Sequence, residues 1–112
     1  MDWPTLPPNP YIEIHAPGDV RIRDTRVDLC IVVEDYLEGH QPEQMAINYP
    51  TLDLEAIHGV IAYYLGHRPE VNSYVELCRA RADQMHAEIA NQPEAPVVKR
   101  LRAIKAARAK AA

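Results

Sequence analysis

The sequence predicts a mainly α-helical protein: a short N-terminal β-hairpin, a three-helix helix-turn-helix-like core, a long fourth helix and a basic C-terminal tail. Three patterns predict this class. Residues 11–23 alternate apolar and polar side chains with a period of two around a turn. Residues 39–57 place two short helical segments on either side of a corner marked by Pro50. From residue 71 to 89, apolar side chains recur at heptad spacing, which indicates a long helix with one apolar face.

The length and composition fit one domain with a modest core, because the chain has 112 residues and 47% of them are hydrophobic. We expect an extended, Pro-rich lead-in over residues 1–10, a β-hairpin plus helical domain over 11–91, and a basic, helix-prone tail over 92–112. No apolar run approaches the ~20 residues that span a bilayer. Residues 1–4 lack the charged and apolar regions of a signal peptide. These features predict a cytoplasmic protein with no membrane partner.

The net charge of −4 hides an asymmetry along the chain. Residues 1–90 hold six Arg or Lys against 15 Asp or Glu, whereas residues 91–112 hold six against one. Nonspecific affinity for nucleic acids comes mainly from neutralising phosphates. The acidic body is therefore excluded as a general nucleic-acid surface, and any DNA contact must come from local basic patches or from the tail.

The first elements follow from local chemistry. Prolines at positions 4, 7, 8 and 10 fix φ and remove backbone donors, which favours an extended start. Residues 11–15 and 20–23 then alternate as two strands, and residues 16–19, Ala-Pro-Gly-Asp, supply the turn. Residues 29–38 contain several β-branched side chains but also fit helical spacing. Their length and the stop at Gly39 favour a helix.

A second helix of about two turns fits between Pro42, which suits a first helical turn, and Pro50, which ends it. Asp53 suits the N-cap of a third helix that runs to about Gly66, with Leu52 and a residue one turn inside forming a hydrophobic staple. The outward face of this helix lacks the Arg, Lys, Asn and Gln side chains best suited to base recognition. The third helix could therefore either pack against the rest of the protein or insert into a DNA groove, and the sequence does not decide between these roles. The residues expected on that face are Glu55, Ala56, His58, Gly59, Ala62 and Tyr63.

A fourth helix opens at Pro69 and carries the heptad seam. It would be ~30 Å long at about 1.5 Å per residue, much for a small body to cover alone. The seam therefore implies either a partner helix in a homodimer or packing against the chain's own three-helix core. The candidate dimer-seam residues are Val71, Val75, Cys78, Ala82, Met85 and Ile89.

The tail follows a break at residues 92–96. Val97, Leu101 and Ile104 share one face of a possible helix, and basic residues spread around the others. This surface is too small to fold by itself, so we expect the tail to order when a partner binds it.

Catalysis and metal binding have little support in the sequence. The five histidines are scattered without a His-x-x-His pair, and no Gly-rich phosphate loop is present. Cys30 and Cys78 lie among apolar neighbours without metal-ligand spacing, so we expect reduced, buried thiols. We expect no enzymatic activity, no metal and no cofactor.

The segment Arg21-Ile22-Arg23-Asp24-Thr25-Arg26-Val27, followed by Gly39, Tyr49-Pro50-Thr51-Leu52 and Tyr63-Tyr64, resembles the domain-of-unknown-function 433 family over about residues 11–75. The family usually has Gly where this chain has Asp24, and Asp tolerates a left-handed backbone better than most residues. The resemblance implies a hairpin and helix-turn-helix domain that acts as a VapB-like antitoxin, often encoded beside a PIN-type ribonuclease toxin that it neutralises.

We therefore expect the antitoxin component of a type II toxin–antitoxin pair, a homodimer whose binding to operator DNA stays open. In this interpretation the tail would contact the toxin, and three arginines of the hairpin region are candidates for DNA contact, although pairing with Asp19, Asp24 and Asp28 is an equal alternative for them. The other hypotheses are a stand-alone DNA-binding transcriptional regulator and a dimeric interaction module without a toxin. The DNA-contact candidates are Arg21, Arg23 and Arg26, and the toxin-contact candidates are Lys99, Arg100, Arg102, Lys105 and Arg108.

Overall fold

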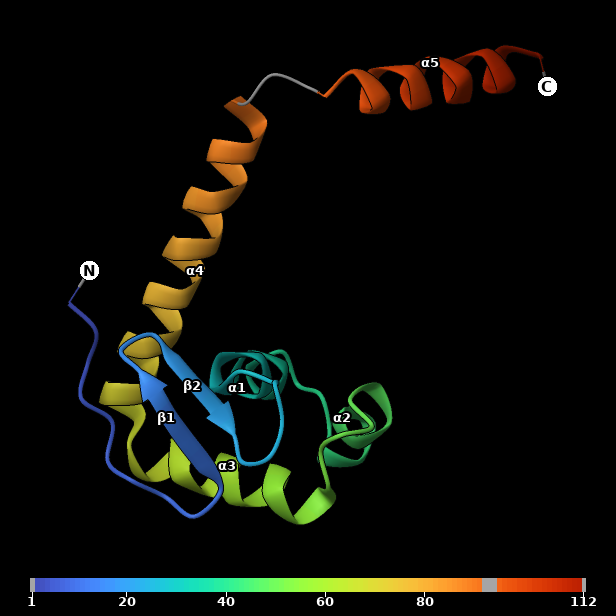
Figure 1. The fold of residues 1–112 in the computed structure, drawn as a ribbon. Helices are drawn as coiled ribbons and strands as arrows, with labels where there is room; N and C mark the ends of the chain where they lie inside the picture. Colours follow the sequence, from blue (N-terminus) through green and yellow to red (C-terminus); the bar gives the residue numbers. More distant parts are fainter. Residues whose placement is uncertain (1, 92–94, 112) are drawn as a thin grey trace. The chain divides into compact units, whose positions relative to one another are not determined.

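The computed structural model describes residues 2–91 and 95–111 and divides into two compact units, residues 1–82 and 83–112 (Figure 1). The predicted mainly helical class, with an N-terminal hairpin, is confirmed. The predicted domain boundary at residue 91 stays a prediction. The elements are β1 (Ile12–Ala16), β2 (Asp19–Ile22), α1 (Leu29–Leu37), α2 (Pro42–Asn48), α3 (Leu54–Gly66), α4 (Arg68–Asn91) and α5 (Pro96–Ala111).

The hairpin pairs β1 with β2 in antiparallel register. Ile12 lies opposite Ile22, and Ile14 lies opposite Val20, after which an irregularity leads into the turn. Because alternate side chains of a strand point to opposite faces, Ile12, Val20 and Ile22 all enter the core. The period-two pattern therefore predicted the buried face of this hairpin.

Two of the three short helices begin where the sequence predicted, α2 at Pro42 and α3 after Asp53, whereas the cap of α1 by Asp28 is a finding of the structure. Asp28 accepts a hydrogen bond from the Cys30 N–H at the start of α1, and Asp53 accepts one from the Ala56 N–H at the start of α3. Pro42 occupies the first turn of α2, where its missing N–H loses no helical bond. The helical interpretation of the β-branched segment in α1 is confirmed.

The core of the first unit lies where the hairpin, α1, α3 and the first turns of α4 meet. α1 packs against α2, α3 and β2 (Figure 1). The buried side chains are mostly aliphatic, with tyrosines whose hydroxyls reach polar partners. The core residues are Leu6, Ile12, Val20, Ile22, Leu29, Val32, Val33, Met45, Leu52, Ile57, Val60, Tyr63, Tyr64, Val71, Tyr74, Val75 and Cys78.

The N-terminal segment is extended, as the prolines predicted, but it also packs against α3. Leu6 is buried in the core, and the Tyr63 hydroxyl donates a hydrogen bond of 2.7 Å to the Pro7 carbonyl. The ring of Tyr11 lies over Gly59 so closely that a Cβ there would meet it at 2.3 Å. Tyr63, expected on the outward face of the helix, is therefore buried, and Gly59 serves close packing.

The heptad seam of α4 divides into two parts. Three of its predicted residues are buried within the first unit: Val71, Val75 and Cys78. The other three are exposed: Ala82, Met85 and Ile89. The first part therefore packs on the chain's own core, which was one of the two alternatives, and only the second part stays a candidate for a dimer.

Among the described residues, no helix is both long enough and apolar enough to cross a membrane.

Candidate functional site

The arginine surface, defined as Arg21, Arg23 and Arg26, lies on β2 and in the turn that follows it. Arg21 is paired rather than available: its Nε and Nη2 donate to the two carboxylate oxygens of Asp19 at 2.9 and 3.0 Å. This paired guanidinium lowers the pKa of Asp19, and Asp19 in turn raises the pKa of Arg21. The internal-pairing alternative therefore holds for Arg21.

The turn after β2 contains Asp24, at the position where members of the family that the sequence resembles usually have glycine. Asp24 has a φ of 60°, in the left-handed region that Asp adopts more readily than most residues. Its N–H donates to a Glu13 carboxylate oxygen at 3.0 Å, and this hydrogen bond lowers the pKa of Glu13. Thr25 closes the turn by donating its hydroxyl proton to the Ile22 carbonyl. The side chains of Glu13 and Thr25 therefore stabilise this turn by hydrogen bonds to its backbone.

The arginine surface borders a shallow hollow of about 600 Å³. Arg21 and Arg26 line it, but so do the carboxylates of Glu13 and Asp24. Arg26 is exposed at its edge, whereas Arg23, also exposed, is not among the lining residues. A phosphate entering this hollow would meet both signs of charge. The structure therefore brings two of the three arginines together, without an exclusively cationic site.

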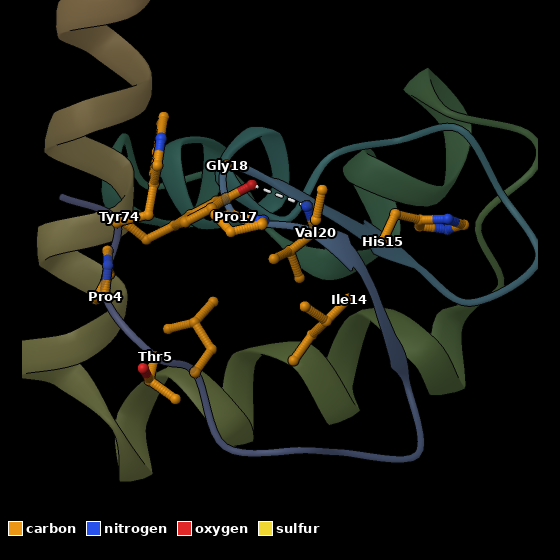
Figure 2. Close-up of a pocket in the computed structure, with 11 residues that line it drawn as sticks. Pro4, Thr5, Ile14, His15, Pro17, Gly18, Val20 and Tyr74 are labelled. Carbon is orange, nitrogen blue, oxygen red and sulfur yellow. Dashed lines mark hydrogen bonds between the residues drawn. The ribbon is translucent and has the colours of Figure 1, made fainter. Parts of the chain in front are cut away.

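A second hollow, of about 290 Å³, lies between the N-terminal segment, the hairpin and α4 (Figure 2). Its walls are mostly apolar, and Tyr74 reaches across it from α4 to the hairpin, where its hydroxyl accepts the Val20 N–H at 3.0 Å. Trp3 closes one side beneath the guanidinium of Arg81, which lies 4.9 Å from the ring centroid. This hollow could not be predicted from the sequence, because it depends on the packing of the N-terminal segment and the hairpin around Tyr74 of α4.

A third constellation joins the start of α1 to α4. Ligating atoms of Asp28, Cys30 and Cys78 all lie within 4.8 Å of one another. The Tyr74 hydroxyl lies 3.0 and 3.1 Å from the two carboxylate oxygens of Asp28 and donates to that carboxylate. Both cysteines are thiols, and their proximity lowers the pKa of Cys78 and raises the pKa of Cys30.

This thiol–carboxylate cluster was missed because ligand motifs are recognised by short spacing, and Cys78 is far along the chain from the other two residues. One signal was present in the sequence: both cysteines lie on apolar helix faces directed to the same core. The inference that they are buried holds for Cys78, while Cys30 is partly exposed.

The tail residues lie on α5, within the second unit. The segment is helical, as its composition predicted. Val97, Leu101 and Ile104 are exposed, so the apolar face has no cover within the described part of the chain. All five toxin-contact candidates are exposed on the same helix: Lys99, Arg100, Arg102, Lys105 and Arg108.

The comparisons with known proteins identify one family. Residues 15–64 match the family described as "Protein of unknown function (DUF433)". The match contains the hairpin turn, the arginine surface and α1 to most of α3, and it supports the resemblance seen in the sequence. No curated protein and no solved structure matches the chain.

Proposed function

We propose that the protein is the antitoxin-like component of a type II toxin–antitoxin pair and neutralises a PIN-type ribonuclease by binding it. The observation that carries the proposal is that α5, in the second unit, carries both exposed apolar side chains and exposed basic side chains. An amphipathic helix with no core of its own gains stability by placing its apolar face in a groove on another protein.

The proposed mechanism uses both faces of α5. Val97, Leu101 and Ile104 would anchor the helix by burial, at roughly 1.5–3 kcal/mol for each fully buried aliphatic side chain. The basic residues would then reach the carboxylates that a PIN-type nuclease gathers around Mg²⁺. An arginine such as Arg100 or Arg102 would bind those carboxylates through charge-assisted hydrogen bonds and displace the metal or the substrate.

Truncation tests this mechanism directly. A chain that ends at Asn91 should stay folded, because the core of the first unit extends only to Cys78, but it should no longer inhibit the purified nuclease or rescue cells that express it. The triple variant Arg100→Glu, Arg102→Glu, Arg108→Glu should lose inhibition with α5 retained. Arg68→Glu, an exposed arginine of the first unit, is the matched control and should inhibit normally. Rescue by the truncated chain would contradict the mechanism.

Dimerisation is the second part of the proposal. Ala82, Met85 and Ile89 extend the heptad seam beyond the core and are exposed, so pairing with a second copy would cover them. A dimer would also present two arginine surfaces, which suits a two-fold operator.

The alternative function is a stand-alone DNA-binding regulator, and the exposure of Arg23 and Arg26 favours it. In that case a gel shift with operator fragments should show specific binding with a steep dependence on salt. Arg23→Ala and Arg26→Ala should each weaken that binding. Arg21→Ala should have a smaller effect, because Asp19 already pairs with Arg21.

A further inference from the structure

Asp28, Cys30 and Cys78 form a partly buried cluster of potential metal ligands. Two soft thiols and one carboxylate converge at the junction of α1 and α4. Asp28 and Cys30 are fixed by the cap of α1, and Cys78 belongs to a buried helical face of α4. The three groups therefore lie at the N-cap of α1, in its first turn and on α4.

The separations suit a small tetrahedral cation. Zn²⁺ binds thiolate sulfur at about 2.3 Å and carboxylate oxygen at about 2.0–2.2 Å, which puts tetrahedral ligands about 3.5–3.8 Å apart. The three ligating atoms lie within 4.8 Å of one another, so adjustments of about 1 Å or less bring them onto a common ion. Thiolates select Zn²⁺ and similar thiophilic ions over Mg²⁺ and Ca²⁺, which prefer oxygen.

The Asp28 carboxylate accepts a hydrogen bond from a buried side chain, as the carboxylate ligands of metal ions commonly do. Tyr74, which is buried, donates to Asp28 and accepts the Val20 N–H, so its hydroxyl is fixed by two elements. Hydrogen bonds of this kind orient ligating carboxylates. Cys30 and Asp28 are both partly exposed, which leaves a path for an ion from solvent.

We propose that the first unit binds one thiophilic divalent cation, Zn²⁺ or a close analogue, through the thiolates of Cys30 and Cys78 and the carboxylate of Asp28. Water completes the coordination. Binding replaces the two thiol protons, which pass to solvent, and it forms two metal–sulfur bonds without oxidation or reduction. The ion connects the start of α1 to α4 and so stabilises the folded first unit. This proposal is independent of any toxin.

Cobalt provides the direct test, because Co²⁺ bound to thiolates gives a sulfur-to-metal charge-transfer band. The full reduced chain, titrated with Co²⁺ alone, should develop this band to one equivalent, and Zn²⁺ should displace it. Zn²⁺ at about 100 times its Kd should lower the unfolded fraction about 100-fold. Absence of the band, or its persistence in the Cys30→Ser, Cys78→Ser double variant, would overturn the proposal.

Three milder variants keep the test valid if loss of buried Cys78 unfolds the chain. Cys30→Ser alone should reduce the intensity of the band. Asp28→Asn retains a capping oxygen for α1 but removes the charge, and it should weaken the affinity for Co²⁺. Tyr74→Phe removes the hydroxyl that orients the carboxylate and should weaken it about 10–100-fold.

The matched control lies in a second group of potential ligands, formed by Asp35, Glu38 and His40 near the end of α1. Asp35→Asn should leave the cobalt band and its affinity unchanged. A reduced chain that binds no metal, together with an oxidised chain that forms a Cys30–Cys78 disulfide, would identify a redox thiol pair and contradict the metal site.

Discussion

The two halves of the α4 seam carry the same kind of side chain at the same spacing, yet one half is buried and the other is not. Val71 and Val75 are 0% and 3% exposed, whereas Met85 and Ile89 are 55% and 64% exposed. Heptad spacing therefore predicts that a helix has an apolar stripe, but it does not predict what covers the stripe. In the first half the cover is the chain's own core. In the second half the stripe is exposed among the described residues, and pairing with a second copy is the proposal that would cover it.

The largest predicted effect compares a core methionine of α2 with an exposed methionine of the α4 seam. Met45 is fully buried and Met85 is exposed. Met45→Ala should lower the free energy of unfolding by about 2–5 kcal/mol, because it removes buried atoms and leaves a cavity. Met85→Ala should change the stability of the monomer by no more than about 0.5 kcal/mol. Urea denaturation at low protein concentration measures both, and a loss for Met85→Ala equal to that for Met45→Ala would contradict the exposure of the second half of the seam.

The next prediction concerns the exposed half of the seam. Met85→Lys with Ile89→Lys should convert the proposed dimer to a monomer in sedimentation experiments, because two charges would be buried in an apolar interface. The monomer should unfold at the same urea concentration as the wild-type chain at high dilution. Ala87→Lys adds a charge on the opposite side of α4 and should leave the dimer intact. An unchanged oligomeric state in the double variant would count against the seam as an interface.

A smaller effect distinguishes two glycines of α3. Gly59→Ala should lower stability by about 1–3 kcal/mol, because the new methyl group would displace the Tyr11 ring and this overpacking exceeds the gain in helix propensity. Gly66→Ala meets nothing within 4 Å and should raise stability by up to about 1 kcal/mol. Thermal unfolding compares them. If Gly59→Ala were stabilising, the contact of the N-terminal segment with α3 would be weaker than proposed.

The smallest effect is electrostatic. The Arg21 guanidinium lowers the pKa of Asp19, so the ion pair stabilises the folded state above the pKa that Asp19 has in the unfolded chain. This contribution is lost as the pH falls through the lower, folded-state pKa. An NMR titration should show the Asp19 pKa rising toward its usual range in Arg21→Ala and staying low in Arg23→Ala. No change in Arg21→Ala would contradict the pairing.

Much of the first unit could be predicted because local chemistry determines it. Period-two alternation indicated the buried side of the hairpin, Pro42 indicated the start of α2, and Asp53 indicated the start of α3. The β-branched run in α1 was ambiguous by composition. It became a helix because Asp28 caps it and Gly39, with a φ of 91°, ends it.

The rest depends on contacts between residues far apart in the chain. The prolines of the lead-in predicted an extended backbone but not that Leu6 would be buried in the core. The proximity of Cys30 and Cys78 required α1 and α4 to pack together, which spacing alone does not reveal. For the arginine surface, the sequence left two alternatives, pairing with aspartates and contact with DNA. The structure decides for pairing at Arg21, which Asp19 binds.

Hydrogen–deuterium exchange of the full chain tests the central claim, that the first unit is stable by itself and the second becomes stable against a partner. Amides of α1 and α3 should exchange most slowly, with protection near that of global unfolding. Amides of α5 should exchange rapidly in the isolated protein, since all its described side chains are exposed, and should slow when the nuclease is added. Protection of α5 equal to that of α3 in the isolated protein would contradict the account.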